Sequence, residues 1–139
     1  GATAAVGLKH PTMSNYRIVT STVHGTSGNI VFEIAYDESV TYTAGSAATL
    51  LLTAGAGSNV TATVTHISGT AIATGVAGNV LRFTATSSQA TTYDLAANVA
   101  MGNRTDLSDT VSTTALELAS GRLTAAVKTA IGYSQITVA

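Results

Sequence analysis

Strict alternation of apolar and polar residues is the feature that most restricts how this chain folds. It is clearest in residues 30–36, where every second residue is large and apolar: Ile30, Phe32, Ile34 and Tyr36. Successive side chains of a β-strand point to opposite faces, so this period places all four residues on one side of a strand. We therefore expect a strand here with one face in the core.

The same period recurs between turn-forming clusters. Further candidate strands are Leu50–Leu52, Val60–Val64 and Leu81–Ala85, with shorter ones at Arg17–Val23, Thr113–Leu118 and Ser134–Val138. The turns between them are Gly25–Gly28, Gly55–Ser58, Ser68–Gly69 and Gly78–Asn79. Short strands with frequent turns predict an all-β fold, an antiparallel sandwich or barrel. Its core is expected to contain Phe32, Ile34, Leu50, Leu52, Val64, Leu81 and Phe83.

Two segments depart from this pattern. In residues 122–131 the apolar positions follow helical spacing, and Gly132 stands where a C-terminal cap would lie. A short helix and a further strand, with Leu123, Ala125 and Val127 on one face, both fit this segment. The first 16 residues show no period, and Pro11 disfavours helix there. We therefore expect an extended N-terminal arm over 1–16 and a single domain over 17–139.

Charge is scarce, and this excludes several classes of function. Six Lys or Arg and seven Asp or Glu make up 9% of the 139 residues, with a net charge of -1, whereas globular proteins average about 25%. A nucleic-acid-binding surface needs a basic stripe, which this composition does not supply. The absence of cysteine excludes disulfides and thiolate metal sites. No apolar run approaches the roughly 20 residues of a membrane-spanning helix, and the first ten residues lack the blocks of an intact signal peptide.

Three segments resemble bacterial and phage immunoglobulin-like domains of the adhesin and virion-associated group. Ile30–Tyr42 looks like a strand that ends in an acidic turn before a Val-Thr strand, and Ala48–Thr53 looks like the apolar strand that follows. Gly78–Thr86, followed by Tyr93–Leu95, looks like the paired-strand region of the family. The resemblance implies an immunoglobulin-like antiparallel β-sandwich that serves as a structural or adhesive module, as on capsid, tail and decoration proteins of tailed phages.

A single copy with an arm and no internal repeat fits a small virion component, by analogy with this family. We expect a non-enzymatic structural protein located in the virion, a phage capsid decoration or auxiliary protein or a tail component. Its expected partners are other copies of itself and a major capsid or other virion protein, with no nucleic acid and no membrane. The alternatives, outside the cell or at its surface, are a filament or array subunit assembled by strand addition, and a carbohydrate- or protein-binding adhesin module.

No catalytic residue, cofactor or metal site is expected. His10, His24 and His66 are not at ligand spacing, and His66, on the same face as Val64, is expected to be a partly buried structural residue. Substituting His66 or Asp94 is therefore expected to change stability alone. The oxygen-rich segment 103–109, with Asp106 and Asp109, is a candidate calcium site together with Asp37 or Glu38. Calcium needs about six to eight oxygen ligands, so a solvated loop fits this segment better.

The remaining motifs have plain structural explanations. Serines among glycines at 25–28 and 55–58 lack the strand-to-helix context of a nucleophile elbow or phosphate loop. Asn59 and Asn103 begin glycan-acceptor triplets, which a chain rich in Thr forms by chance. The tyrosines are expected to be sandwich corners or interface anchors: Tyr16, Tyr36, Tyr42, Tyr93 and Tyr133.

Overall fold

The computed structural model describes residues 13–19, 28–43, 48–87, 89–95, 107–109 and 125–138. Within these residues the strands are β1 (Met13–Ile18), β2 (Asn29–Tyr42), β3 (Thr49–Ala54), β4 (Val60–Ile67), β5 (Thr70–Ala71), β6 (Ala77–Thr86), β7 (Thr92–Leu95), β8 (Leu107–Asp109) and β9 (Ile136–Thr137). The helix is α1 (Ala125–Ala130). The all-β prediction is confirmed.

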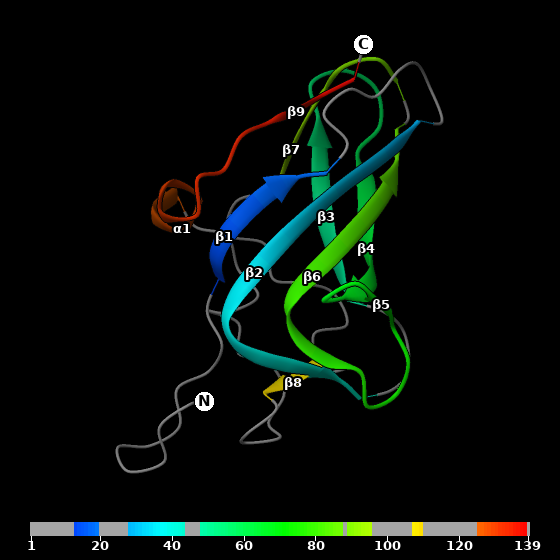
Figure 1. The fold of residues 1–139 in the computed structure, drawn as a ribbon. Helices are drawn as coiled ribbons and strands as arrows, with labels where there is room; N and C mark the ends of the chain where they lie inside the picture. Colours follow the sequence, from blue (N-terminus) through cyan, green and yellow to red (C-terminus); the bar gives the residue numbers. More distant parts are fainter. Residues whose placement is uncertain are drawn as a thin grey trace.

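The strands form one antiparallel sheet that curls into a nearly barrel-like shape (Figure 1). Its order is β1-β2-β6-β4-β3-β7-β9, with β5 attached to β4 and β8 attached to β2. The long strand β2 pairs with β6 up to Ala35↔Val80, and the pairing resumes at Val40↔Gly78 after an irregularity. Beyond this irregularity the end of β2 also pairs with β8, from Val40↔Asp109 to Tyr42↔Leu107.

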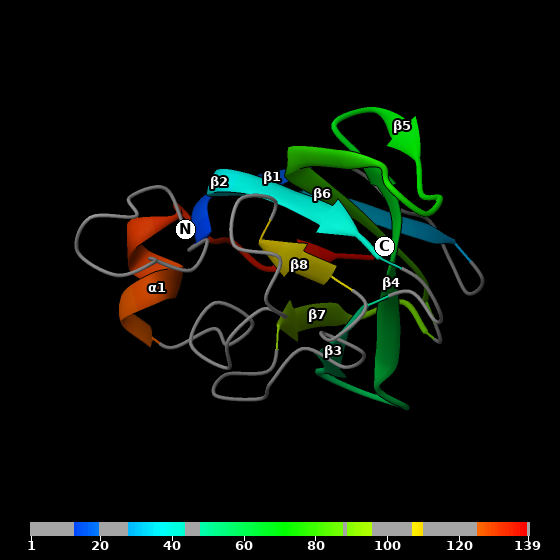
Figure 2. The ribbon, with the colours of Figure 1, turned by 90° about the horizontal axis from the view of Figure 1, so that it is seen from below.

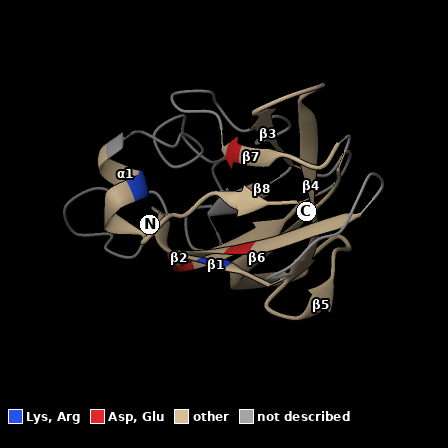
Figure 3. Ribbon diagram, turned by 90° about the horizontal axis from the view of Figure 1, so that it is seen from above, with Lys and Arg blue, Asp and Glu red and all other residues tan. Residues whose placement is uncertain are grey.

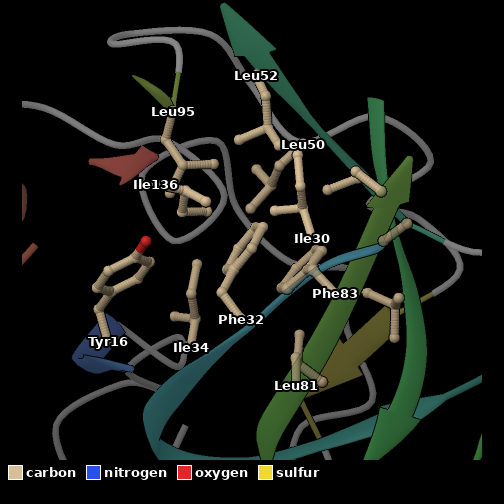
Figure 4. Packing of buried hydrophobic residues seen from close by; sticks show 14 of the residues in the cluster. Tyr16, Ile30, Phe32, Ile34, Leu50, Leu52, Leu81, Phe83, Leu95 and Ile136 are labelled. Carbon is tan, nitrogen blue, oxygen red and sulfur yellow. The ribbon is translucent and has the colours of Figure 1, made fainter. Parts of the chain in front are cut away.

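The predicted core is confirmed. All seven residues expected there are at most 3% exposed, because the alternation of each strand turns its apolar side inward. The rings of Phe32 and Phe83 stack across β2 and β6 with centroids 5.2 Å apart. Leu95 and Ile136 pack toward the same core from β7 and β9 (Figure 4).

The two ends of the sheet meet next to Tyr16. The backbone amide of Tyr16 donates to the carbonyl of Ile131 over 3.0 Å, and its hydroxyl donates to the carbonyl of Ser134 over 3.0 Å. These bonds connect β1 to the segment between α1 and β9, which runs close to β1 when the molecule is seen from below (Figure 2). The barrel-like curl is thus held at its seam by hydrogen bonds outside the strand ladders.

The first strand begins earlier than the sequence indicated. Met13 pairs with Tyr36 and Asn15 with Ala35, so residues 13–16 belong to the sheet and not to the expected arm. The alternation of β1 is not visible in the sequence because Tyr16 alone is buried in this strand, while its other residues are exposed or half-buried. Residues 1–12 lie outside the described part, as does most of the expected strand 17–23.

Both a helix and a strand were considered for residues 122–131. Within this segment, residues 125–130 form a helix. Gly132 has a φ of +72°, a conformation that costs glycine little. The amide of Gly132 bonds the carbonyl of Thr129, and the amide of Tyr133 bonds the carbonyl of Lys128, which is the Schellman arrangement of a helix end. The predicted cap is confirmed. The candidate strand Thr113–Leu118 lies outside the described residues.

Candidate functional site

The outer face of the sheet, which points away from the core, is a candidate functional surface. One row across it runs through paired residues of four strands, Val31 on β2, Thr84 on β6, Thr63 on β4 and Thr49 on β3. All four are half-buried. The hydroxyl of Thr65 lies 3.4 Å from that of Thr84, within hydrogen-bonding distance. The row, which we call the hydroxyl row, is therefore rich in threonine hydroxyls.

Charged side chains are absent from one side of this face. The strands β3, β4 and β5 contain no Lys, Arg, Asp or Glu (Figure 3). Desolvating a hydroxyl costs less than desolvating a charge, and a surface with few charges is poorly protected against association. This part of the face therefore has the chemistry of an interface more than that of a solvated surface.

An ionic group stands on the same outer face, over β1, β2 and β6. Arg17 Nη2 lies 2.5 Å from Glu33 Oε1, and Arg82 Nη2 lies 2.9 Å from Glu33 Oε2. Partial burial raises the pKa of Glu33, but hydrogen bonds and positive charge from both arginines outweigh it and leave that pKa below its ordinary value. Residues 17, 33 and 82 share a face because Arg17↔Glu33 and Glu33↔Arg82 are pairs in the ladders.

A second polar group, which we call the terminal cluster, consists of Tyr16, Asp94, Lys128 and Tyr133. Lys128 Nζ donates to the carbonyl of Leu95 over 2.6 Å and lies 3.4 Å from Asp94 Oδ1. The hydroxyl of Tyr133 donates to the same carboxylate oxygen and accepts a bond from the amide of Leu95. Lys128 also lies 4.7 Å from the centre of the Tyr133 ring. These contacts hold α1 and the chain end against β7.

Burial raises the pKa of Tyr16 and of Tyr133 above the ordinary value, and the nearby charge of Asp94 raises both further. The two rings lie 5.0 Å apart. Both hydroxyls therefore stay protonated and act as hydrogen-bond donors. The contacts of the terminal cluster hold α1 and the residues after it against β7.

His66 is half-buried, as expected, but it does not share the face of Val64. The pairing of β4 with β6 shifts between Val64↔Phe83 and His66↔Arg82, so Thr65 is an extra residue and the alternation changes there. Ile67 is consequently the next buried position, and His66 lies opposite Arg82 on the outer side. Its Nδ1 lies 3.0 Å from the hydroxyl of Thr65. A bulge of this kind cannot be seen in a threonine-valine alternation.

The other predicted positions are only partly described. Asn59 is exposed, and its side-chain oxygen accepts a bond from the amide of Ala54 over 2.9 Å, so it closes the turn that contains Gly57 (φ +77°). Asp37 is exposed and Glu38 half-buried, on β2. His10, His24, Asn103 and Asp106 lie outside the described residues, and for Asp109 the backbone alone is described. Among the described side chains, no group of three or more His, Asp or Glu is placed to hold a metal.

The sequence reading missed both polar groups. Arg17, Glu33 and Arg82 are 16 and 49 residues apart, and Asp94 and Tyr133 are 39 apart. The first group forms by strand pairing and the second by packing of the residues after α1 against β7, and the sequence offers no local signal for either.

Comparison with protein-family models, with curated proteins and with solved structures yields no match. In the part of the chain that the structure describes, no helix is long and apolar enough to cross a membrane.

Proposed function

We propose that the curled sheet is an immunoglobulin-like β-sandwich, and the strand order supports this fold. In the constant-type sandwich, strands A, B, E and D form one sheet and strands C, F and G the other. When the strands of the main path are lettered in chain order, β1-β2-β6-β4 corresponds to A-B-E-D and β3-β7-β9 to C-F-G. The β3–β4 pairing then joins the two halves.

A tyrosine at the entrance to β7 supports the same fold. Immunoglobulin-like sandwiches carry a tyrosine near the start of strand F whose hydroxyl bonds the backbone a few residues upstream. Tyr93 is fully buried, and its hydroxyl donates to the carbonyl and accepts from the amide of Gln89, both over 3.0 Å. Leu95 is buried two residues later, where antibody domains carry a cysteine.

On this fold we propose a non-enzymatic structural protein of a virion: a phage capsid decoration or auxiliary protein, or a tail component. The observation that carries the proposal is the hydroxyl-rich outer face of β3 and β4, which lacks charged side chains. Such a face can be covered by a particle lattice at a low desolvation cost. The segment before β1 is proposed to add a second attachment by pairing with an exposed sheet edge on a neighbour.

A filament or surface-array subunit is the second candidate, and the position of β1 favours it. β1 is the first strand of the sheet order, and on its edge away from β2 the amide of Tyr16 bonds the carbonyl of Ile131. A strand from another copy could extend the sheet at this edge by backbone hydrogen bonds once it displaces the segment between α1 and β9. Size-exclusion chromatography with electron microscopy separates the candidates, because a filament subunit forms open-ended polymers without any other protein.

The virion proposal is tested by mixing the purified protein with particles assembled from the virion proteins that are encoded next to it. Thr63→Lys and Thr84→Lys place a charge on the hydroxyl row, and Thr74→Lys is the control because Thr74 is exposed outside that row. Deletion of residues 1–12 tests the arm without cutting β1. We expect both row variants and the deletion to reduce occupancy on sedimented particles, while the control binds normally. Unchanged occupancy for the row variants would contradict the proposal.

A further inference from the structure

The ionic group on the outer face borders a shallow pocket. Asn15, Arg17, Glu33, Ala35 and Val80 line it. Ala35 and Val80 form a small aliphatic floor, while Asn15 and Arg17, both exposed, bring amide and guanidinium donors to its rim. The pocket lies across β1, β2 and β6, where the paired residues Asn15↔Ala35 and Ala35↔Val80 are neighbours.

Arg82 changes the charge of this pocket although it does not line it. Its Nε and Nη2 both lie within 3.0 Å of Glu33 Oε2, so it neutralises the carboxylate from the side of β6. Glu33 is 14% exposed at its side chain and holds Arg17 through its other oxygen. One carboxylate between two guanidinium groups leaves one net positive charge, and Arg17, at 61% exposure, presents it to the pocket.

Arg17 has N–H groups that its contact with Glu33 does not use. The contacts found within the described residues use one of its nitrogens, Nη2, which donates to Glu33. An arginine carries five N–H groups in a planar fork whose shape matches a carboxylate. A carboxylate that enters the pocket can therefore accept from this fork and from the amide of Asn15. The methylene groups that carry this carboxylate would then lie on Ala35 and Val80.

We propose that this pocket binds an acidic side chain, a glutamate or aspartate, of a partner protein. The inference rests on the proposed function in one respect, that the outer face is covered by another protein. Arg17 is the contacting residue, and Glu33 and Arg82 are positioning residues that orient it and preserve its charge. A nucleic acid is disfavoured because its phosphates require a basic stripe, and the neighbouring strands β3, β4 and β5 contain no Lys or Arg.

The test is an NMR titration of the purified full chain with a short capped oligoglutamate peptide. We expect saturable shifts of the Arg17 Nε–Hε signal and of the Asn15, Ala35 and Val80 amides, and weaker binding as salt is raised. Arg17→Gln should weaken binding roughly tenfold, the loss typical of a charged hydrogen bond. Arg82→Gln should weaken it as well, although Arg82 does not line the pocket.

Two further variants make the result specific. Arg17→Lys keeps the charge without the fork and should bind more weakly than the unmodified chain. Lys128→Gln removes the same charge on α1 and should bind normally. Amide spectra of β2 and β6 report whether each variant is folded, and Arg17→Lys is the fallback if Arg17→Gln is not.

Three outcomes would overturn the proposal: no saturable shift at the pocket, Arg17→Gln or Arg17→Lys binding as tightly as the unmodified chain, or inorganic phosphate or a short oligonucleotide binding the same residues at least as tightly. Because the titration uses the free protein, these outcomes are independent of whether the chain enters a particle. Conversely, normal peptide binding together with unchanged particle occupancy of the threonine variants would reject the virion proposal and leave the pocket in place.

Discussion

Two regions of this molecule hold together in different ways. The long-strand region (β2, β4 and β6) has strands of 14, 8 and 10 residues joined by backbone ladders. The terminal region (β7, α1 and β9) has elements of only 4, 6 and 2 residues. It depends on side chains, because its ladder between β7 and β9 contains two residue pairs, Thr92↔Thr137 and Tyr93↔Ile136.

The difference shows where a protein with few charges needs polar side chains to hold its elements together. In the long-strand region, alternation alone buries the apolar side and pairs the backbone. In the terminal region, Lys128, Tyr133 and Asp94 replace missing ladder bonds. The outer face of the long-strand region carries the hydroxyl row and the ionic group around Glu33.

The largest effect is expected from emptying the core of the long-strand region. Phe83 is fully buried and stacks on Phe32, so Phe83→Ala should lower the free energy of unfolding by about 3–5 kcal/mol through lost burial and a cavity. Denaturant unfolding measures this loss. Thr86→Ala, at an exposed site on the same strand, should change it by less than about 0.5 kcal/mol. A cost below about 1 kcal/mol for Phe83→Ala would mean that the alternation of this strand was assigned to the wrong face.

The next effect is at the entrance to the terminal region. Tyr93→Phe removes the hydroxyl that bonds both backbone groups of Gln89. It keeps the buried ring. We expect a loss of about 1–3 kcal/mol in unfolding free energy, because the hydrogen bonds are lost at a buried site. Denaturant unfolding measures this loss, and a loss below about 0.5 kcal/mol would remove the special role given to Tyr93.

The same contrast explains how much the sequence could predict. The long strands and their core were predicted because seven large residues repeat with a period of two, and all seven are buried. The cap at Gly132 was predicted because glycine adopts a positive φ readily. The short strands β5 and β8 are too brief for a period to be visible, whereas β9 lies within the predicted strand Ser134–Val138. The bulge at Thr65 and the start of β1 at Met13 depend on pairing partners distant in the sequence.

The candidate sites divide in the same way. Local chemistry was sufficient to predict the turn at Gly55–Ser58, while His66 is partly buried as predicted but not on the face of Val64. The pocket beside Glu33 arises from the pairing of β1, β2 and β6, and the terminal cluster from the packing of α1 and Tyr133 against β7. No composition or spacing rule brings those residues together.

A smaller, local effect is expected when the terminal cluster is weakened. Tyr133→Phe removes the donor to Asp94 and the acceptor of the Leu95 amide, which should cost about 1 kcal/mol. Because the long-strand region does not depend on this contact, hydrogen exchange should accelerate by roughly fivefold at the amides of residues 131–138. The amides of β2 and β6 should keep their rates. Equal acceleration in both regions would show that they open as one unit.

The smallest effect is expected on the outer face and depends on pH. The pKa of Glu33 is lower in the folded chain than its ordinary value, so its stabilising contribution is complete above the unfolded pKa of about 4.3 and is lost as the pH falls below it. Arg17 is 61% exposed, and water screens such a pair, so Glu33→Gln should cost less than about 1 kcal/mol at neutral pH. Denaturant unfolding of both proteins between about pH 7 and pH 2 measures the difference, which should shrink toward the acid end. A difference that stays constant over this range would mean that Glu33 contributes through its packing and not through its charge.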